Sequence, residues 1–396
     1  MNNKEVFDLT DQYIMYTYKR FPIALKNGKG AYLYDYDGNE YLDFLAGISV
    51  NALGYSNPAI IKAVKELSEG LFHTSNLFYT LNQSLLAKTL VDNSDLDKAF
   101  FCNSGAEANE GAIKLARKWG NGRYEIIAME NSFHGRTMGA LSATGQTKYQ
   151  KGFEPSLTGF KFAPYNDFSA LEKMITEKTV AVMLEPLQAE GGIIVPNQEY
   201  MQKVEKLCRE KNLLMILDEV QTGMCRTGKL FAYQHFGIKP DIITLAKALG
   251  GGLPIGTMLA KAEVAASFEP GNHASTFGGG EFITGVALAS LNILINEKIA
   301  EHAAETGAYF LSELKEIAVK HNTKVKEARG MGLLLGIELK DNVSLSEFGA
   351  MLLKNGLLTA SAGSNVVRFA PPLIIEKEHV DKAIKIVDDT LTNFAS

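Results

Sequence analysis

DIITLAKALGGGLPIG, residues 241–256, joins an apolar strand-like run to Lys247 and then to a cluster of glycines. A lysine at the end of a buried strand loses hydration as a cation, which lowers its pKa and makes the nucleophilic amine available near neutral pH. The glycines leave room for a flat molecule to approach the backbone. Taken alone, Lys247 is more often a lysine that extends from the core into water. Its meaning therefore depends on the rest of the chain.

Short apolar runs alternate with helical segments around this stretch. Between about Ser56 and Asn296 the runs include KAFFC, YEIIAM, TVAVMLEP and LLMILDE. This alternation is typical of βαβ units, so we predict an α/β fold with a mostly parallel sheet. We expect residues 56–296 to form a large domain.

The two ends of the chain predict a second, smaller α/β layer. AYLYDYDGNEYLDF (31–44) alternates aromatic and polar residues around an Asp37–Gly38 turn, which indicates a β-hairpin. After one long helical stretch at 282–318, GLLLGIEL and NVVRFA read as strands, and SLSEFGAMLLKNG and EHVDKAIKIVDDTLTNF read as helices. No Pro-rich or Ser-rich linker interrupts the chain. We expect a small domain built from residues 1–55 and 297–396.

Composition limits the classes of partner. A net charge of −5 without a basic stripe disfavours nucleic acid and anionic membrane surfaces. The N-terminus lacks the layout of a signal peptide, and the longest apolar runs are too short to cross a bilayer. Cys102, Cys208 and Cys225 form no CxxC pair, which argues against a disulfide framework and a zinc site. We therefore expect a cytoplasmic protein without a bound metal.

Two polar positions follow predicted strands, where open parallel sheets bind ligands. After KAFFC, the loop at Ser104, Gly105 and Ala106 opens a helix, and its amides could hold an anion. The loop matches neither GxxxxGK[ST] nor GxGxxG, which counts against nucleotides. After LLMIL comes Asp218, a carboxylate that needs a partner if it is buried. The structural alternative for Ser104 and for Asp218 is a helix cap, which is the commoner case for each alone.

An anion cup, a buried carboxylate and a strand-end lysine together match pyridoxal phosphate. The cup would take the phosphate, Asp218 would keep the ring nitrogen protonated, and Lys247 would bind the aldehyde covalently. Phe133, after the strand YEIIAM, could stack on the ring. A core phenylalanine is the alternative for Phe133.

The motifs then bring the chain close to a known family. YLDFLAGISVNALG, HTSNLFYT, FFCNSGAEANEGAIKLAR, FHGRT, EPLQAEGG, LDEVQTGMCRTG, LAKALGGGLPIG, STFGG and VVRFAPPL occur in the family's order. The chain resembles the class III aminotransferases of the fold-type I pyridoxal phosphate enzymes, and among them the acetylornithine aminotransferases. The resemblance implies a large domain with a mostly parallel seven-stranded sheet and a smaller α/β domain built from both termini.

The resemblance also implies roles for individual residues. Lys247 would be the catalytic acid/base, and Gln221 would lie near the ring hydroxyl of the cofactor. Thr276, in STFGG, would complete the phosphate site from the neighbouring subunit, which implies a homodimer with shared active sites. An isolated threonine would otherwise be a loop residue. Asn76 and Ser275 are further substrate-binding candidates.

Three charged residues suggest how two amine donors share one pocket. Arg136 would hold the carboxylate far from the reacting amine in both substrates, by bidentate pairing. Arg368 would bind the α-carboxylate of glutamate, and the family resemblance points to Glu190 as the carboxylate that neutralises Arg368 when the ω-amine donor is bound. For any one of the three, a surface ion pair or a loop position is the alternative.

The substrate favoured by the resemblance is N2-acetylornithine, with 2-oxoglutarate as acceptor and glutamate as product. His134 supports this choice, since ornithine aminotransferases tend to carry tryptophan there. Succinylornithine, succinyl-diaminopimelate, ornithine and 4-aminobutyrate stay open as alternatives, as do a dinucleotide-dependent oxidoreductase and a cofactor-binding regulator. The chain departs from the family pattern at Tyr55, Asn57, Cys225 and Gly280. None of these departures removes an atom that the chemistry requires.

Overall fold

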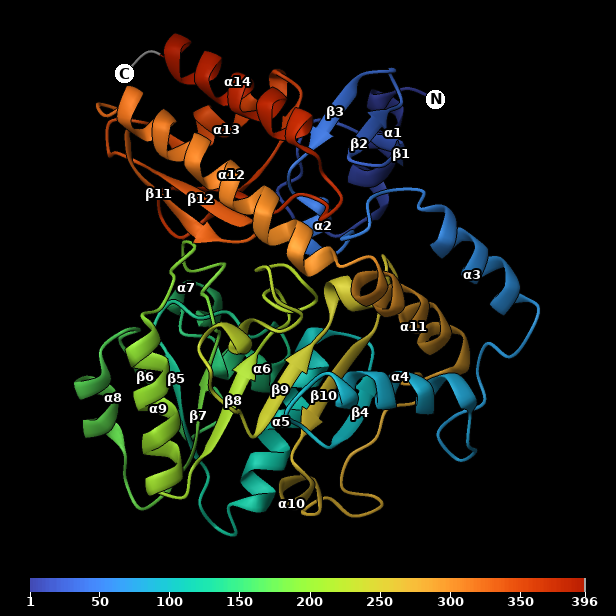
Figure 1. The fold of residues 1–396 in the computed structure, drawn as a ribbon, viewed down its shortest axis with the longest axis vertical. Coiled ribbons are helices and arrows are strands. Elements are labelled where there is room, and N and C mark those ends of the chain that lie inside the picture. The colour runs from blue at the N-terminus through green and yellow to red at the C-terminus, as the bar shows by residue number, and fades with distance from the viewer. Residues whose placement is uncertain (395–396) are drawn as a thin grey trace.

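Seven strands form one large sheet in the computed structural model, which describes residues 1–394 (Figure 1). In spatial order they are β4 (Lys98–Cys102), β10 (Gly256–Ala260), β9 (Ile242–Leu245), β8 (Leu214–Asp218), β7 (Thr179–Leu184), β5 (Glu125–Met129) and β6 (Phe160–Ala163). Only β10 runs antiparallel to its neighbours, so the predicted mostly parallel sheet is confirmed. Strands β7, β8 and β9 are buried throughout, as continuous apolar runs predict for a covered parallel sheet.

Helices cover both faces of this sheet. Leu214 and Ile216 of β8 belong to the same core cluster as Ile113 of α5, whereas Met215 of β8 belongs to the cluster that includes Val204 of α9. Since alternate residues of a strand point to opposite faces, α5 and α9 lie on opposite sides of the sheet. The helices of residues 56–296 are α3 (Pro58–Ser68), α4 (Leu81–Asp92), α5 (Gly105–Trp119), α6 (Met138–Ala143), α7 (Thr147–Gln150), α8 (Phe168–Met174), α9 (Gln198–Glu210), α10 (Ala262–Ala265), α11 (Glu281–Asn296) and the 3-10 turns η1 (Ala232–His235) and η2 (Lys247–Gly250).

Two smaller sheets are built from the chain ends. The first has the order β1 (Leu25–Lys29), β2 (Tyr32–Asp35), β3 (Glu40–Asp43), β13 (Leu357–Leu358), and the second β11 (Val325–Met331), β12 (Leu334–Leu339), β15 (Val366–Phe369), β14 (Ala360–Ala362). The predicted hairpin is confirmed as β2 and β3, which pair Tyr32 with Leu42. Strands β1, β11, β13 and β14 were not predicted. The helices of these ends are α1 (Asn3–Tyr13), α2 (Ala46–Ser49), α12 (Ile299–Lys320), α13 (Leu345–Lys354) and α14 (Lys377–Asn393).

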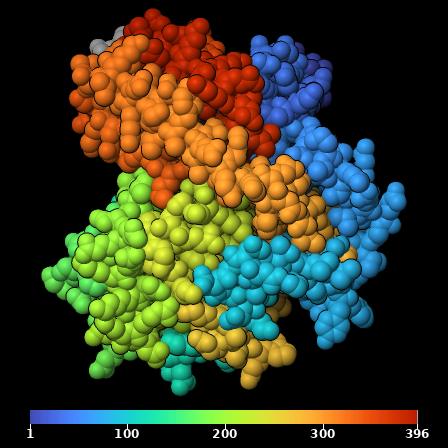
Figure 2. Space-filling model, in the orientation of Figure 1, coloured from blue at the N-terminus to red at the C-terminus, as the bar shows by residue number. Residues whose placement is uncertain are grey.

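The two ends of the chain pack into one lobe. Figure 2 shows the N-terminal residues, in blue, beside the C-terminal residues, in red, at the top of the view, and β13 pairs with β3. The rings of Phe44, Phe310 and Phe369 are fully buried, and Phe310 meets each of the other two edge-on at 5.4 Å between centroids. This arrangement supports the division into residues 56–296 and a small domain from 1–55 and 297–396, which we retain as a proposal.

The long helical stretch predicted at 282–318 is two helices, α11 and α12. Lys298 between them has a φ of 53°, a left-handed conformation that ends one helix before the next begins. Within residues 1–394 no single helix is long and apolar enough to span a membrane. Helices α11 and α12 reach that length and apolar content only when they are taken together, and they are bent by 63° where they meet.

Candidate active site

A cavity of about 540 Å³ opens at the carboxyl ends of the parallel strands. Strands β8 and β9 end at its floor, and the N-terminus of α5 forms one wall. Among the residues predicted from the sequence, its lining includes Ser104, Gly105, Ala106, Phe133, Arg136, Glu190, Asp218, Gln221 and Lys247. The fold thus brings together residues that lie up to 143 positions apart, from Ser104 to Lys247.

Lys247 begins η2 two residues after β9 ends, with a φ of 47°. A left-handed backbone is unfavourable for a residue with a side chain and is a common sign of a functional position. No hydrogen bond or ion pair to the Lys247 amine forms within residues 1–394. Burial lowers the pKa of Lys247 to about 8, against the opposing effect of Glu190. The amine is therefore a ready nucleophile and base.

Asp218 ends β8 and lies buried beside Thr244 of β9. Its Oδ2 accepts a hydrogen bond of 2.8 Å from Asn109 Nδ2 and lies 2.8 Å from His134 Nδ1, while Oδ1 accepts one of 3.0 Å from Val220 N. Asn109 in turn accepts from Thr244 Oγ1 at 2.8 Å. No helix follows Asp218 directly, so it is not a helix cap.

His134 faces this carboxylate. The sequence argument treated it as a marker of substrate choice, whereas its ring is buried and contacts Asp218. Asn109 and Thr244 were missed in the sequence because each sits inside an ordinary helix or strand pattern.

The N-terminus of α5 lines the cavity where the sequence predicts an anion cup. Ser104 is the N-cap of α5, and its Oγ accepts a 3.2 Å hydrogen bond from Glu107 N. Both interpretations of Ser104 are therefore compatible, because a cap residue also lines the cup. A Cβ on Gly105 would lie 2.7 Å from Val220 Cγ1, so only glycine fits there. Helix N-termini favour anions because their amides are free and the helix dipole is positive.

The aromatic wall is held by a carboxylate that the sequence analysis missed. Glu185 is buried at the end of β7 and accepts hydrogen bonds from Phe133 N at 2.7 Å and Ala189 N at 3.1 Å. Burial raises the pKa of Glu185 to about 7. Glu185 follows an apolar run just as Asp218 does, so the same rule could have found it.

Arg136 is exposed, with its Cζ 4.1 Å from the ring centre of Tyr149.

Arg368 and Glu190 form an ion pair at the edge of the cavity. Arg368 lies on β15, is 3% exposed, and also donates to Gln221 Oε1 at 3.1 Å. Burial would raise the pKa of Glu190, but Arg368 outweighs burial and the pKa is lowered. Glu190 lines the cavity and Arg368 does not, so the carboxylate stands between the cation and the open space.

Besides Arg368, three predicted residues lie outside this cavity. Asn76 and Ser275 line a separate hollow of about 370 Å³, where Asn76 Nδ2 donates to Gly278 O at 2.8 Å. Thr276 is exposed in the loop before α11. Their assignment to the site stays a prediction, which for Thr276 requires a second subunit.

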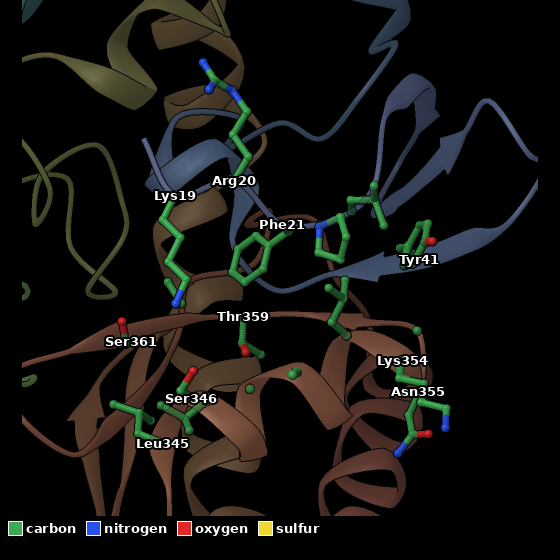
Figure 3. A pocket seen from close by; sticks show the side chains of 18 of the residues that line it. Lys19, Arg20, Phe21, Tyr41, Leu345, Ser346, Lys354, Asn355, Thr359 and Ser361 are labelled. Carbon is green, nitrogen blue, oxygen red and sulfur yellow. The ribbon is translucent and has the colours of Figure 1, made fainter. Parts of the chain in front are cut away.

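A larger hollow, about 1160 Å³, is lined by none of the predicted site residues. It lies between the N-terminal segment and α13, where Lys19 and Phe21 point toward Thr359 and Ser346 (Figure 3). Val367 lines this hollow from β15. Arg368, the next residue, points to the opposite face of the strand, toward Glu190.

Residues 13–391 match the family described as Aminotransferase class-III. The acetylornithine aminotransferase of Methanocaldococcus jannaschii is 48% identical over 397 residues, covering 99% of each chain. That of Caldanaerobacter subterraneus subsp. tengcongensis is 51% identical over 386 residues, covering 96% of this chain and 98% of the relative.

Solved structures of similar fold cover the whole chain. An ornithine aminotransferase from Toxoplasma gondii, with pyridoxal phosphate at partial occupancy in its active site, has a TM-score of 0.94 and 35% identity, covering 98% of this chain and 94% of that one. The acetylornithine aminotransferase from Elizabethkingia anophelis has a TM-score of 0.89 and 34% identity, with 100% of both chains covered.

The burial of Lys247 predicts a measurable pH dependence of stability. Its folded pKa of about 8 lies below the ordinary 10.5, so the folded protein is penalised while the amine is charged. The penalty, about 3 kcal/mol, is complete below pH 8 and disappears as the pH rises from 8 to 10.5. Lys247→Met should therefore raise the free energy of unfolding of the ligand-free protein at pH 7. Denaturant unfolding of both proteins from pH 6 to 10.5 measures the difference, and a gap independent of pH would contradict the shift.

Proposed function

The chain belongs to the class-III aminotransferase family, and we propose that it transfers the δ-amino group of N2-acetylornithine to 2-oxoglutarate in arginine biosynthesis. The products are N-acetylglutamate 5-semialdehyde and glutamate. The observation that carries the proposal is the Glu190–Arg368 ion pair beside the Lys247 cavity. Glutamate has two carboxylates and acetylornithine has one, so an arginine that Glu190 can pair with or release suits both substrates.

Class-III aminotransferases use pyridoxal phosphate, and the cavity residues fit it. The fit rests on three features. Within residues 1–394 the buried amine of Lys247 has no hydrogen-bond or ion-pair partner, and Asp218 is a buried carboxylate. At the N-terminus of α5, a side chain larger than that of Gly105 would clash with Val220. When bound, the cofactor supplies a protonated ring that takes up the electron pair of a breaking substrate bond.

We assign the cofactor contacts accordingly. Lys247 would bind the aldehyde and Asp218 the ring nitrogen, while Phe133 would cover the ring and Gln221 would lie near its hydroxyl. The phosphate would be held by Ser104, Gly105 and Ala106.

Lys247 supplies the proton transfer. An amine with a pKa of about 8 accepts a proton readily near neutral pH and returns it as readily, which suits a group that must act as base and acid in turn. Asp218 keeps its place during this exchange because neutral and backbone donors hold both of its oxygens.

The arginines sort the substrates. Arg136 is exposed at the cavity wall and free to hold the distal carboxylate of either donor. Glutamate brings a second carboxylate, for which Glu190 must release Arg368. Acetylornithine places an uncharged chain there, and Glu190 then keeps Arg368 neutralised, since an unpaired buried cation is costly.

We also propose a homodimer with shared active sites. Large apolar side chains are exposed on the N-terminal segment and on the loop before α4, among them Met15, Tyr16, Leu77, Phe78 and Tyr79. Apolar patches of this kind mark association surfaces. Phe277, next to Thr276, is also exposed, which supports a role for that loop at the interface.

A cytoplasmic location is supported by the cysteines. Cys102, Cys208 and Cys225 are all free and buried, as suits a reducing compartment. Fractionation of the source cells tests this assignment.

Substrate specificity tests the proposed function. With 2-oxoglutarate as acceptor, kcat/KM for N2-acetylornithine should exceed those for ornithine and 4-aminobutyrate by at least about tenfold, the usual reach of pocket discrimination. Steady-state assays that include succinylornithine measure the ranking, with Lys247→Ala as the inactive control. A preference for ornithine would overturn the acylated substrate.

Glu190→Ala tests the cover over Arg368. Without Glu190, Arg368 stays available for glutamate and faces the acetylornithine chain unpaired. The ratio of single-turnover rates should shift by at least about thirtyfold in favour of the glutamate half-reaction, the lower end of the cost of one uncompensated buried charge. Equal losses in both half-reactions would contradict the role of Glu190.

The dimer is tested by its mass and its surface. Light scattering should give twice the 43.2 kDa of one chain. Leu77→Glu should raise the dimer dissociation constant by at least about tenfold, because it places a charge in an apolar interface. Val319→Glu on α12 is the matched control, since Val319 is 74% exposed and Leu77 86%. Equal effects of the two substitutions would refute this interface.

A further inference from the structure

The loop that carries Glu190 is closed on itself. It leaves the end of β7, and residues Gln188 and Ile194 exchange two backbone hydrogen bonds, of 3.1 and 2.9 Å, across its base. Between them, Glu190, Gly192 and Ile193 form a tip whose carbonyl groups point away from the loop's own backbone. All three carbonyl oxygens accept hydrogen bonds from the C-terminal part of the chain, from either Arg329 or Gly363.

Arg329 of β11 makes most of these contacts. Its Nε lies 3.0 Å from Ile193 O and 3.2 Å from Gly192 O, and its Nη2 donates to Gly192 O at 2.6 Å. On the other side, Nη1 donates to Glu327 and Glu338. The planar guanidinium therefore has its donors spread between two carboxylates and two carbonyls, which an ammonium group cannot match in geometry.

Two further contacts bind the same tip. Gly363 N donates to Glu190 O at 2.8 Å from the turn between β14 and β15. Ile193 is fully buried at a φ of 55°, in an apolar cluster with Leu334 and Val366. A β-branched residue holds a left-handed backbone only when its surroundings compensate the strain. The loop thus follows a strand of the large sheet in sequence, but the contacts of its tip are with the small sheet that carries Arg368.

We propose that Arg329 is a positioning residue for substrate selection. It holds the backbone of Glu190 at the place from which the Glu190 side chain reaches Arg368. On this arrangement Glu190 covers and releases Arg368 by rotation of its side chain, while its backbone stays in place. Arg329 is not among the residues that line the cavity. The inference rests on the proposed function, since it concerns the same two half-reactions.

Arg329→Met removes the donors to the loop. The single-turnover rate with N2-acetylornithine should fall relative to that with glutamate by about fivefold, which corresponds to the net contribution of one ordinary hydrogen bond. Lys326→Met is the matched control, because Lys326 pairs with Glu338 on the same strand pair but contacts no loop carbonyl. The control should leave the ratio unchanged. Arg329→Lys, which keeps the charge but not the fork, should give an intermediate ratio.

Two measurements separate positioning from general damage. In the Glu190→Ala background, Arg329→Met should no longer change the ratio, because the group that it positions is gone. Hydrogen exchange of the peptide spanning 186–196 should be faster in Arg329→Met than in Lys326→Met, and thermal unfolding identifies any loss of the folded protein.

The possible failures are distinct. Equal loss in both half-reactions, an effect that persists in the Glu190→Ala background, or unchanged exchange of the loop would overturn the role of Arg329 and leave the aminotransferase assignment standing. If the wild-type protein prefers another ω-amine, the acetylornithine assignment fails, and the same comparison run with that amine still decides the role of Arg329.

Discussion

Asp218 is a buried carboxylate, and the need to hold its charge away from water organises the surrounding structure. Two oxygens at the end of a covered strand would be costly without donors. The chain supplies them from a helix, a loop and the following backbone, through Asn109, His134 and Val220 N. Thr244 orients Asn109 from the adjacent strand. The strand order, the helix α5 and the loop after β5 must all be correct for this one group to be stable.

Lys247 is the opposite case, a buried cation that the structure leaves without a direct partner. Its lowered pKa is the consequence of that arrangement, and it is what makes the amine useful as a base. Glu190 lies close enough to oppose the shift but is itself paired with Arg368. The site therefore combines a hydrogen-bonded anion and a desolvated cation in one cavity, with the ion pair of Glu190 and Arg368 at the edge of that cavity.

The small and large sheets meet at that ion pair. Arg368 comes from β15, and Glu190 comes from a loop of the large sheet that Arg329 and Gly363 fasten to the small one. On the proposed roles of these residues, substrate choice depends on contacts made by residues far from the reacting amine. Because the loop of Glu190 is fastened to the sheet of Arg368, the side chain of Glu190 can rotate while the backbones of the two residues stay in place.

The sequence alone determined the parallel sheet, the hairpin at Asp37–Gly38 and the strand-end positions of Lys247, Asp218 and Ser104, because apolar periodicity and the polar residues that end a strand are local properties of the chain. Only the tertiary structure decided that Asn109 holds Asp218, that Glu185 holds Phe133 and that Arg329 holds the loop of Glu190. These partners come together through contacts between residues as many as 137 positions apart, and no local pattern encodes them. The physical reason is that the partner of a buried polar group depends on which residues the fold brings next to it, whereas a strand or helix depends mainly on residues close by in sequence.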